Sequence, residues 1–196
     1  AQDLVTAGQR AAINLGGVEI DQVSRGQTLA AEGSLSVTRR ADVDLELLAS
    51  ARALRHGARV RVHDGTAEVL ARVSVAGADT AEVAAGGRAL ARLRLESAAA
   101  LSRGDRVILR SYSPPLTIGA ATVLDPAPAA PGIRSAAGLA RMEELRGADG
   151  PRALAAMVRD RGLRGLPLAD AVARAGIVPA DVDGVCRALE REGVVL

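Results

Sequence analysis

The sequence predicts a mainly β protein, in which an antiparallel β-barrel is followed by a small α-helical domain of winged-helix type. Over about the first 125 residues, apolar and polar side chains alternate in short runs separated by turn formers. Many short, half-polar strands at this spacing are typical of a barrel or a sandwich. The apolar period then becomes helical, and Pro and Gly flank the helical segments. These two patterns decide the fold class.

The strands follow from alternation in the first part of the chain. Each run places its apolar residues on one face, and pairs such as Asp64-Gly65 and Gly86-Gly87 supply turns between the runs. Clear alternation predicts strands at 41–49, 59–63, 67–75 and 88–96, and weaker patterns predict strands at 10–15, 106–110 and 117–124.

The second part of the chain has a different composition. Residues 126–138 contain three prolines among alanines, which indicates a linker. Three apolar stripes at helical spacing follow, starting near Pro151, Pro167 and Pro179 and ending before Gly162, Gly176 and Gly193. Residues 194–196 are predicted to open a strand. Three helices and a strand suggest a winged-helix domain at 139–196 that is truncated at the wing.

Composition limits the possible functions. The 25 basic residues are all Arg and 23 acids oppose them, so the net charge is only +2 and nucleic-acid contact requires local patches. A GC-rich coding sequence explains the absence of Lys, although Arg also suits bidentate phosphate contacts. No apolar run reaches the length of a membrane span, and the N-terminus has no signal peptide. A cytoplasmic location is expected, and the missing initial Met suggests a fragment.

Catalytic and metal-binding motifs are missing from the sequence. Without Lys there is no G-x-x-x-x-G-K-[ST] phosphate loop, and no G-x-S-x-G elbow is present. One cysteine and two isolated histidines supply neither a disulfide nor a convincing metal or acid–base site. We therefore expect a non-catalytic chain with no cofactor and no metal.

Several segments resemble elongation factor Tu-like GTPases, in particular their selenocysteine-specific branch. The first three, AGQRAAINL, the Gly17-Val18 turn and SRGQTLA, are similar to the end of the second domain of that family, and the others are similar to its third-domain barrel. The segments are 7–15, 17–18, 24–30, 54–57, 60–69, 104–110 and 117–126. A helical domain after the barrel also favours the selenocysteine-specific branch.

The resemblance implies a division of the chain and a set of partners. Residues 1–31 would end domain II, 32–125 would form the domain III barrel, 126–138 a linker and 139–196 the first winged-helix module. Such a factor delivers selenocysteyl-tRNA to the ribosome at recoded UGA codons. It binds GTP and Mg in a GTPase domain that these residues lack, and downstream winged-helix repeats bind a hairpin in the messenger RNA. No membrane partner is expected.

The resemblance also nominates site residues. Arg10 occupies the position of an arginine near the selenocysteyl pocket, where a guanidinium would favour an anionic selenolate over a neutral serine hydroxyl. His63 and Thr66 lie at a turn, and Arg110, Ser111 and Tyr112 at a loop, that match surfaces facing the tRNA T-stem. The alternatives are an exposed strand arginine, an ordinary turn, and a strand connection whose tyrosine covers a barrel end.

The remaining arginines leave their own alternatives open. Arg59 with Arg61, and Arg92 with Arg94, recur at two-residue spacing, so each pair shares a sheet face. They predict either a basic stripe or a solvated barrel surface. Arg187 lies on the last helix among acidic residues that would repel phosphate, which favours a spacer role for the helical part.

Three other function classes remain possible at this point. The barrel can belong to another translational GTPase, such as an archaeal-type initiation factor subunit, although the helical tail argues against this. The chain can also be a winged-helix transcription regulator with a β-barrel sensor domain, or an accessory domain of an enzyme.

Overall fold

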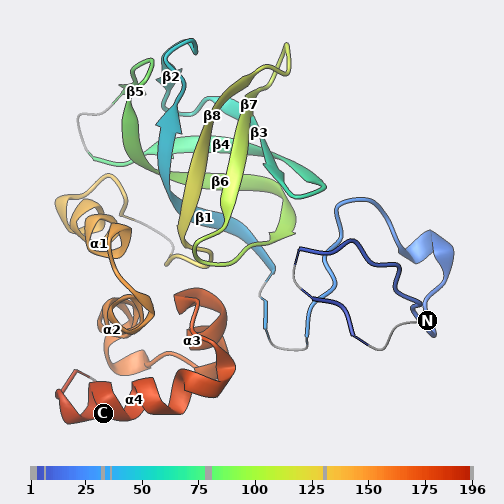
Figure 1. Ribbon diagram of the computed structural model, residues 1–196. Coiled ribbons are helices and arrows are strands. Elements are labelled where there is room, and N and C mark those ends of the chain that lie inside the picture. The colour runs from blue at the N-terminus through green and yellow to red at the C-terminus, as the bar shows by residue number, and fades with distance from the viewer. Residues whose placement is uncertain are drawn as a thin grey trace.

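A closed barrel with a helical part packed against its outer surface makes up most of the computed structural model (Figure 1). The structure describes residues 4–6, 8–31, 34–35, 37–77, 81–129 and 132–194, with only the backbone at 169–171. The barrel has the strand order β1-β6-β4-β3-β7-β8, and β8 pairs with β1 to close it. Every strand pairing in the barrel is antiparallel. The predicted antiparallel barrel is therefore confirmed.

The strands follow the alternating runs of the sequence. A separate two-stranded sheet, β2-β5, was not predicted because its strands are too short to alternate. The strands are β1 (Val37–Leu47), β2 (Leu54–Arg55), β3 (Arg59–Asp64), β4 (Ala67–Val75), β5 (Glu82–Val83), β6 (Arg88–Ala100), β7 (Arg106–Ser111) and β8 (Thr117–Asp125).

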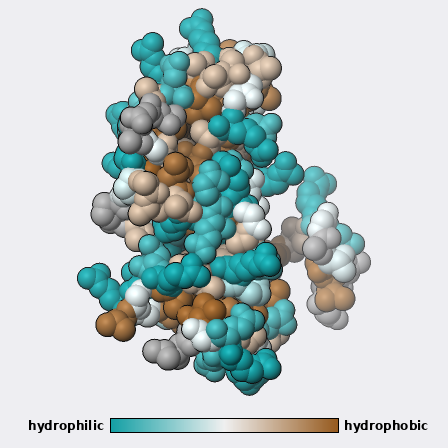
Figure 2. Space-filling view, turned by 90° about the vertical axis from the view of Figure 1, so that its left-hand side faces the viewer, coloured by the Kyte–Doolittle hydropathy of each residue, from teal (hydrophilic) through white to brown (hydrophobic). Residues whose placement is uncertain are grey.

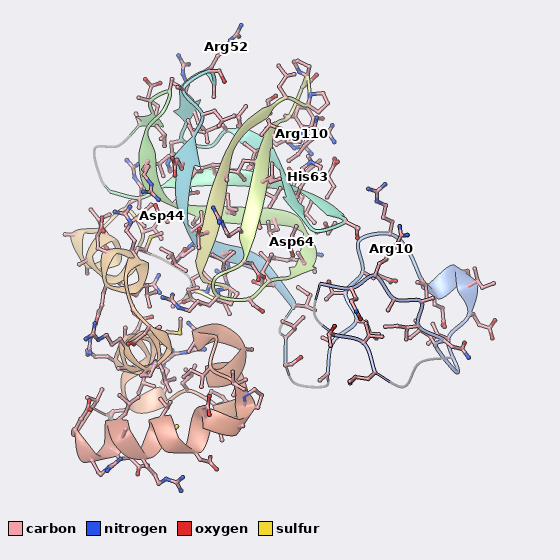
Figure 3. All side chains as sticks on the ribbon, in the orientation of Figure 1. Arg10, Asp44, Arg52, His63, Asp64 and Arg110 are labelled. Carbon is pink, nitrogen blue, oxygen red and sulfur yellow. The ribbon has the colours of Figure 1, made fainter. Side chains whose placement is uncertain are left out.

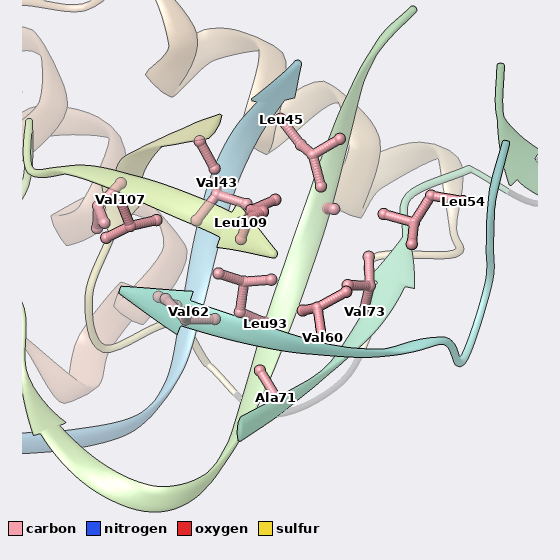
Figure 4. Packing of buried hydrophobic residues seen from close by; sticks show 14 of the residues in the cluster. Val43, Leu45, Leu54, Val60, Val62, Ala71, Val73, Leu93, Val107 and Leu109 are labelled. Carbon is pink, nitrogen blue, oxygen red and sulfur yellow. The ribbon is translucent and has the colours of Figure 1, made fainter. Parts of the chain in front are cut away.

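Aliphatic side chains fill the barrel core in the part of the chain that the structure describes. Because successive side chains of a strand point to opposite faces, each run sends every second residue inward. Figure 4 shows Val43 and Leu45 of β1 packed with Leu93 of β6 and Leu109 of β7, and all four side chains are buried. Burying one such side chain contributes roughly 1.5–3 kcal/mol.

The strand predicted at 10–15 is wrong. Residues 8–31 contain turns and one short 3-10 helix, η1 (Ile20–Gln22), but no strand. A strand needs a partner edge, and each barrel strand already pairs on both sides, so this segment finds none. It contacts the barrel at Gly26 (φ +94°), where an added Cβ would lie 3.0 Å from the Cα of Ala67.

The helical part contains one more helix than predicted. Its elements are α1 (Ala136–Arg146), α2 (Gly150–Arg161), η2 (Gly162–Arg164), α3 (Leu168–Ala175), η3 (Pro179–Asp181) and α4 (Val182–Arg191). The three helices predicted from Pro and Gly are present. The additional helix, α1, starts inside the predicted linker 126–138, with the Ser135 hydroxyl accepting a hydrogen bond from the Gly138 amide at 3.1 Å.

The winged-helix assignment stays a prediction. Between residues 132 and 194 the structure has helices and no strand. Residues 195 and 196 of the predicted wing strand lie outside the described residues.

The barrel and the helices share a second apolar core. Three residues from the barrel strands and the loop after β4, Ala76, Leu90 and Leu124, pack with buried residues of the helical part such as Met142 and Met157. This core covers one outer side of the barrel, so the helical part is not a separate body on a free linker.

A buried ion network crosses the same junction. Asp42 of β1 and Asp125 of β8 are both 0 % exposed. Arg92 and Arg141 each place a guanidinium nitrogen 2.6 Å from an Asp42 carboxylate oxygen, and Arg174 of α3 lies 2.8 Å from Asp125. Arg92 is only 2 % exposed because the helices cover this part of the outer face. The predictions that Arg92 lies on a basic stripe or on a solvated barrel surface are therefore both wrong.

Candidate nucleic-acid interface

The outer faces of β3, β4 and β7 bring several of the nominated residues together. Arg61 of β3 lies opposite Arg110 of β7, and His63 lies opposite Glu68 of β4. These side chains point away from the barrel interior because Val60 and Val62 between them point inward. Figure 3 shows His63 and Arg110 near one another on this side of the barrel.

The β3–β4 turn presents Thr66 to solvent. Ala67 pairs with Asp64, so Gly65 and Thr66 form a two-residue hairpin turn, and Gly65 supplies the positive φ (+51°) that such a turn needs. Thr66 is exposed at the tip. Its hydroxyl is accessible to a ligand at the end of the hairpin.

Two nitrogen atoms of this face have no hydrogen-bond partner. His63 Nε2 is buried and lies 3.6 Å from Glu68 Oε2, which exceeds hydrogen-bond distance. Arg110 Nε is also buried and without a partner among the described residues. Buried polar atoms are normally paired, so these two atoms are exceptions on this face.

Ion pairs neutralise part of the positive charge on the face. The hydrogen bond from Arg61 lowers the pKa of Glu68, and the hydrogen bond from Arg59 lowers the pKa of Glu96. Arg59 binds Glu96 through two nitrogens, with the Nε–Oε1 distance at 2.7 Å. Both carboxylates therefore stay ionised at neutral pH and position the two arginines.

Tyr112 lies between these arginines on the outside of the barrel. The guanidinium carbon of Arg59 is 4.5 Å from the ring centroid, and that of Arg61 is 5.7 Å away. Arg61 Nε also donates to the Tyr112 carbonyl at 3.1 Å. The tyrosine remains 43 % exposed, so part of its ring is accessible for stacking.

Ser111 has a different role from its neighbours. Its hydroxyl donates to the carbonyl of Pro114 and accepts from the amide of Leu116 at 3.2 Å. These bonds fix the loop that carries Tyr112. Ser111 therefore holds the loop in shape, and its hydroxyl is already occupied.

Asp64 lies at the edge of a small cavity. Burial raises the pKa of Asp64, and the nearby charge of Asp105 raises it further. The cavity has a volume of about 110 Å³ and is lined by Asp64, by residues of the barrel end and by Arg25, Gly26 and Thr28 of the N-terminal segment. It is too small for a nucleotide.

The structure does not bring Arg10 into this group. Arg10 is exposed on the N-terminal segment, and Figure 3 shows it away from His63 and Arg110. No strand surrounds it, so its nomination as part of a strand loses its structural context. Its assignment to a selenocysteyl pocket stays a prediction.

The helical part offers a groove of mixed charge. A groove of about 1010 Å³ lies between α2 and α4, and its lining includes Asp149, Asp181, Asp183, Arg152 and Arg187. Such a lining gives no net attraction for a polyanion. Figure 2 shows the side of the molecule that lies at the left of Figure 1. Hydrophilic side chains are spread over this side, with apolar areas between them.

The described part of the chain has neither a membrane-spanning helix nor a metal-binding cluster. No helix among them is long and apolar enough to span a bilayer. No cluster of three or more His, Cys, Asp or Glu side chains able to hold a metal ion occurs in the described ranges.

The barrel matches a known protein family. Residues 39–130 match the family model described as selenocysteine-specific elongation factor, beta-barrel domain. The selenocysteine-specific elongation factor of Desulfomicrobium baculatum is 30 % identical over 171 residues, covering 87 % of this chain and 26 % of that protein. Residues 39–130 are therefore similar to the β-barrel domain of SelB-type elongation factors. This finding favours the selenocysteine-specific branch over the transcription regulator and the enzyme accessory domain.

A solved structure supports the same fold. The bacterial selenocysteine-specific elongation factor EF-Sec superposes with a TM-score of 0.66 at 23 % identity, over 85 % of this chain and 25 % of that one. The chain thus spans about a quarter of the length of the two relatives that it matches.

Sequence reasoning missed the acidic partners of the interface. Glu68 lies opposite His63 across the hairpin, and the position of the Asp64-Gly65 turn would have predicted that pairing. Glu96 pairs with Arg59 across strands that are distant in sequence, and no local signal indicates this contact.

Proposed function

We propose that this chain is the tRNA-contacting barrel region and first winged-helix module of a SelB-family factor that delivers selenocysteyl-tRNA to the ribosome at recoded UGA codons. One observation carries the proposal beyond the family match. Arg61, His63, Arg110 and Tyr112 gather on one outer face of β3, β7 and the loop after β7.

Each side chain of this face has a use in RNA binding. Arg110 and His63 can donate to phosphate oxygens, and the Thr66 hydroxyl can reach a ribose 2′-OH or a phosphate at the hairpin tip. The exposed part of the Tyr112 ring can pack against a sugar or a base. Ser111 positions that ring, and Glu68 positions Arg61.

The role proposed for this chain is binding rather than catalysis. Its sequence has no Lys, so the phosphate loop that would hold GTP and Mg²⁺ lies outside these residues. Winged-helix repeats downstream would hold the messenger RNA hairpin, and the whole factor would act in the cytoplasm. Arg10 would favour the selenolate of the aminoacyl group once the rest of its pocket is present.

Binding of tRNA to the chain tests the proposal. Fluorescence anisotropy with a labelled selenocysteine-specific tRNA transcript would compare the chain with Arg110→Ala and His63→Ala. Loss of a phosphate contact should weaken binding by about 5–10-fold for each variant. Arg52→Ala is the matched control because Arg52 is exposed on the loop after β1, and Figure 3 shows it apart from His63 and Arg110. Equal affinities for all four proteins would refute the assigned face.

The role of Arg10 needs its own test. Binding of selenocysteyl-tRNA and seryl-tRNA would be measured with the intact protein and with Arg10→Ala. The substitution should weaken selenocysteyl-tRNA binding selectively, because only the selenolate is anionic. An equal loss for both ligands, or no loss, contradicts the role.

A further inference from the structure

A row of four arginines crosses the outside of the barrel next to the Tyr112 loop. Arg40 of β1 lies directly opposite Arg94 of β6, Arg94 lies opposite Arg72 of β4, and Arg72 lies opposite Arg59 of β3. Arg59 packs against Tyr112, so the row ends at the candidate interface. At about 4.8 Å between neighbouring strands, the row extends over roughly 14 Å.

The row is positive and largely unpaired. Arg40, Arg72 and Arg94 are exposed, and the only carboxylate ion-paired with the row in the described part of the chain is Glu96, which binds Arg59. Arg39 adds a fifth guanidinium, because the bulge in β1 leaves Arg39 and Arg40 both exposed and Arg39 Nη1 reaches the main-chain carbonyl of Glu96 at 2.8 Å.

Such a row works against the stability of the barrel. Like charges directly opposite one another on adjacent strands repel, and here three successive strand pairs carry that arrangement. Two residues along the same strands the charges are opposite, because Arg92 of β6 faces Asp42 of β1 and forms an ion pair with it. The row, in which Arg59 alone has an ion-pair partner among the described residues, is therefore suited to an anion from outside the chain.

We propose that Arg40, Arg94, Arg72 and Arg59 form a track for successive phosphates of an RNA backbone, an inference that rests on the proposed function. Guanidinium groups bind phosphates bidentately, and the track continues the RNA-contacting face from Tyr112 across β4 and β6 to β1. The RNA therefore contacts two sides of the barrel rather than the Tyr112 loop alone.

The composition of the track favours RNA over an acidic protein. The centres of protein–protein interfaces are depleted of charged residues, whereas nucleic-acid interfaces are strongly positive. The track consists of guanidinium groups with one tyrosine at its end and has no exposed apolar centre.

Salt dependence of RNA binding tests the track. The 196-residue chain would be titrated with a labelled 20-base-pair RNA duplex between 50 and 200 mM KCl, beside an Arg40→Gln/Arg94→Gln variant. Loss of two phosphate contacts should reduce the slope of log K against log salt by roughly 1.4–1.8. An Arg52→Gln/Arg55→Gln variant removes the same charge away from the track and should keep the slope.

Every outcome bears on one of the two proposals. Measurable RNA binding with an unchanged slope in the Arg40/Arg94 variant overturns the track alone. No binding of the duplex or of tRNA by the unaltered chain overturns the proposed function as well. Binding of a poly-glutamate peptide that needs Arg40 and Arg94, with RNA binding that does not, assigns the row to an acidic protein instead. Thermal unfolding verifies folding, and the variant should melt at the same or a higher temperature because repulsion is removed.

Discussion

At the scale of single residues, Tyr112 is the most informative side chain of the interface. It is the only aromatic residue of the chain, and two guanidinium groups lie against its ring. A contact of this kind contributes about 0.5–1 kcal/mol at an exposed site. The ring therefore orders the arginines while part of its surface stays exposed.

Two substitutions of Tyr112 distinguish the contribution of its ring to tRNA binding from that of its hydroxyl. Tyr112→Leu should weaken tRNA binding about 5–150-fold, because stacking on an aromatic ring is worth about 1–3 kcal/mol. Tyr112→Phe keeps the ring and should retain most of the affinity. Anisotropy titrations of both variants measure this. A loss in the Phe variant equal to that in the Leu variant would show that the hydroxyl, not the ring, makes the contact.

Asp64 should make the stability of the barrel depend on pH. Its pKa is raised in the folded state by burial and by Asp105, so folding favours the protonated form. The resulting penalty is present above the folded pKa and disappears as the pH falls below the unfolded value of about 3.9. Asp64→Asn should therefore stabilise the protein at pH 7 and have no effect near pH 3.

The size of this effect is small because Asp64 is partly solvated. After allowance for solvent screening, the gain at pH 7 is about 0.5 kcal/mol or less. Urea unfolding at both pH values measures it, with Glu190→Gln on the exposed side of α4 as the control. A destabilised Asp64→Asn variant at pH 7 would contradict the prediction.

The residues of the interface were only partly predictable from sequence. Alternation placed Arg61 and His63 on the outer face because it depends on neighbours in the chain. The pairing of Arg59 with Glu96 and the burial of Arg92 depend on strands and helices that are distant in sequence. No pattern within one run contains that information.

At the scale of elements, Arg103 joins the barrel to the helical part. From the turn before β7, it donates to the main-chain carbonyls of Leu124 at β8, of Leu145 at 2.7 Å and of Ala148 at 2.8 Å. Burial lowers the pKa of Arg103, and Asp125 and Asp149 oppose that shift. A cation beside the last carbonyls of α1 also complements the helix dipole.

Removal of this side chain should destabilise the junction. Arg103→Met should cost about 2–3 kcal/mol, because several hydrogen bonds from a charged donor are lost and buried carbonyls remain unpaired. Arg106→Met, on an exposed position of β7, should stay within about 0.5 kcal/mol. Urea unfolding compares the two variants. A cost for Arg103→Met no larger than that of the control would remove its assigned role.

Elements with local signals were predicted well and the others were not. The helices α2 and α3 end at Gly162 and Gly176, and both glycines adopt positive φ angles. A glycine after an apolar stripe is the signal that marked these ends in the sequence. Helix α1 also ends at a glycine, Gly147, but no proline marks its start, and its apolar residues Met142 and Leu145 are buried in the core that the helices share with the barrel. The strand at 10–15 failed because pairing is a tertiary property.

At the scale of the whole molecule, the buried ion network makes the barrel and the helices one unit. Asp42 binds Arg92 of the barrel and Arg141 of α1 at once. Asp42→Ala should cost about 3–5 kcal/mol, because Arg92 would be left buried without its counterion. Glu46→Ala, at an exposed ion pair with Arg88, should cost less than about 1 kcal/mol.

The network also predicts a single unfolding transition. Helical circular dichroism at 222 nm and hydrogen exchange of β1 amides should report the same midpoint in urea for the intact chain. Separate midpoints for the two signals would show that the helices unfold independently of the barrel.

In the shared core, the helical part covers an apolar patch on the outside of the barrel. Ala76, Leu90 and Leu124 lie beneath it, next to the carboxylates of Asp42 and Asp125. A barrel separated from its helices by a protease cut after Pro126 would expose this apolar patch to water. We expect such a barrel to self-associate and lose solubility, so the tail protects the barrel from aggregation before it serves any partner.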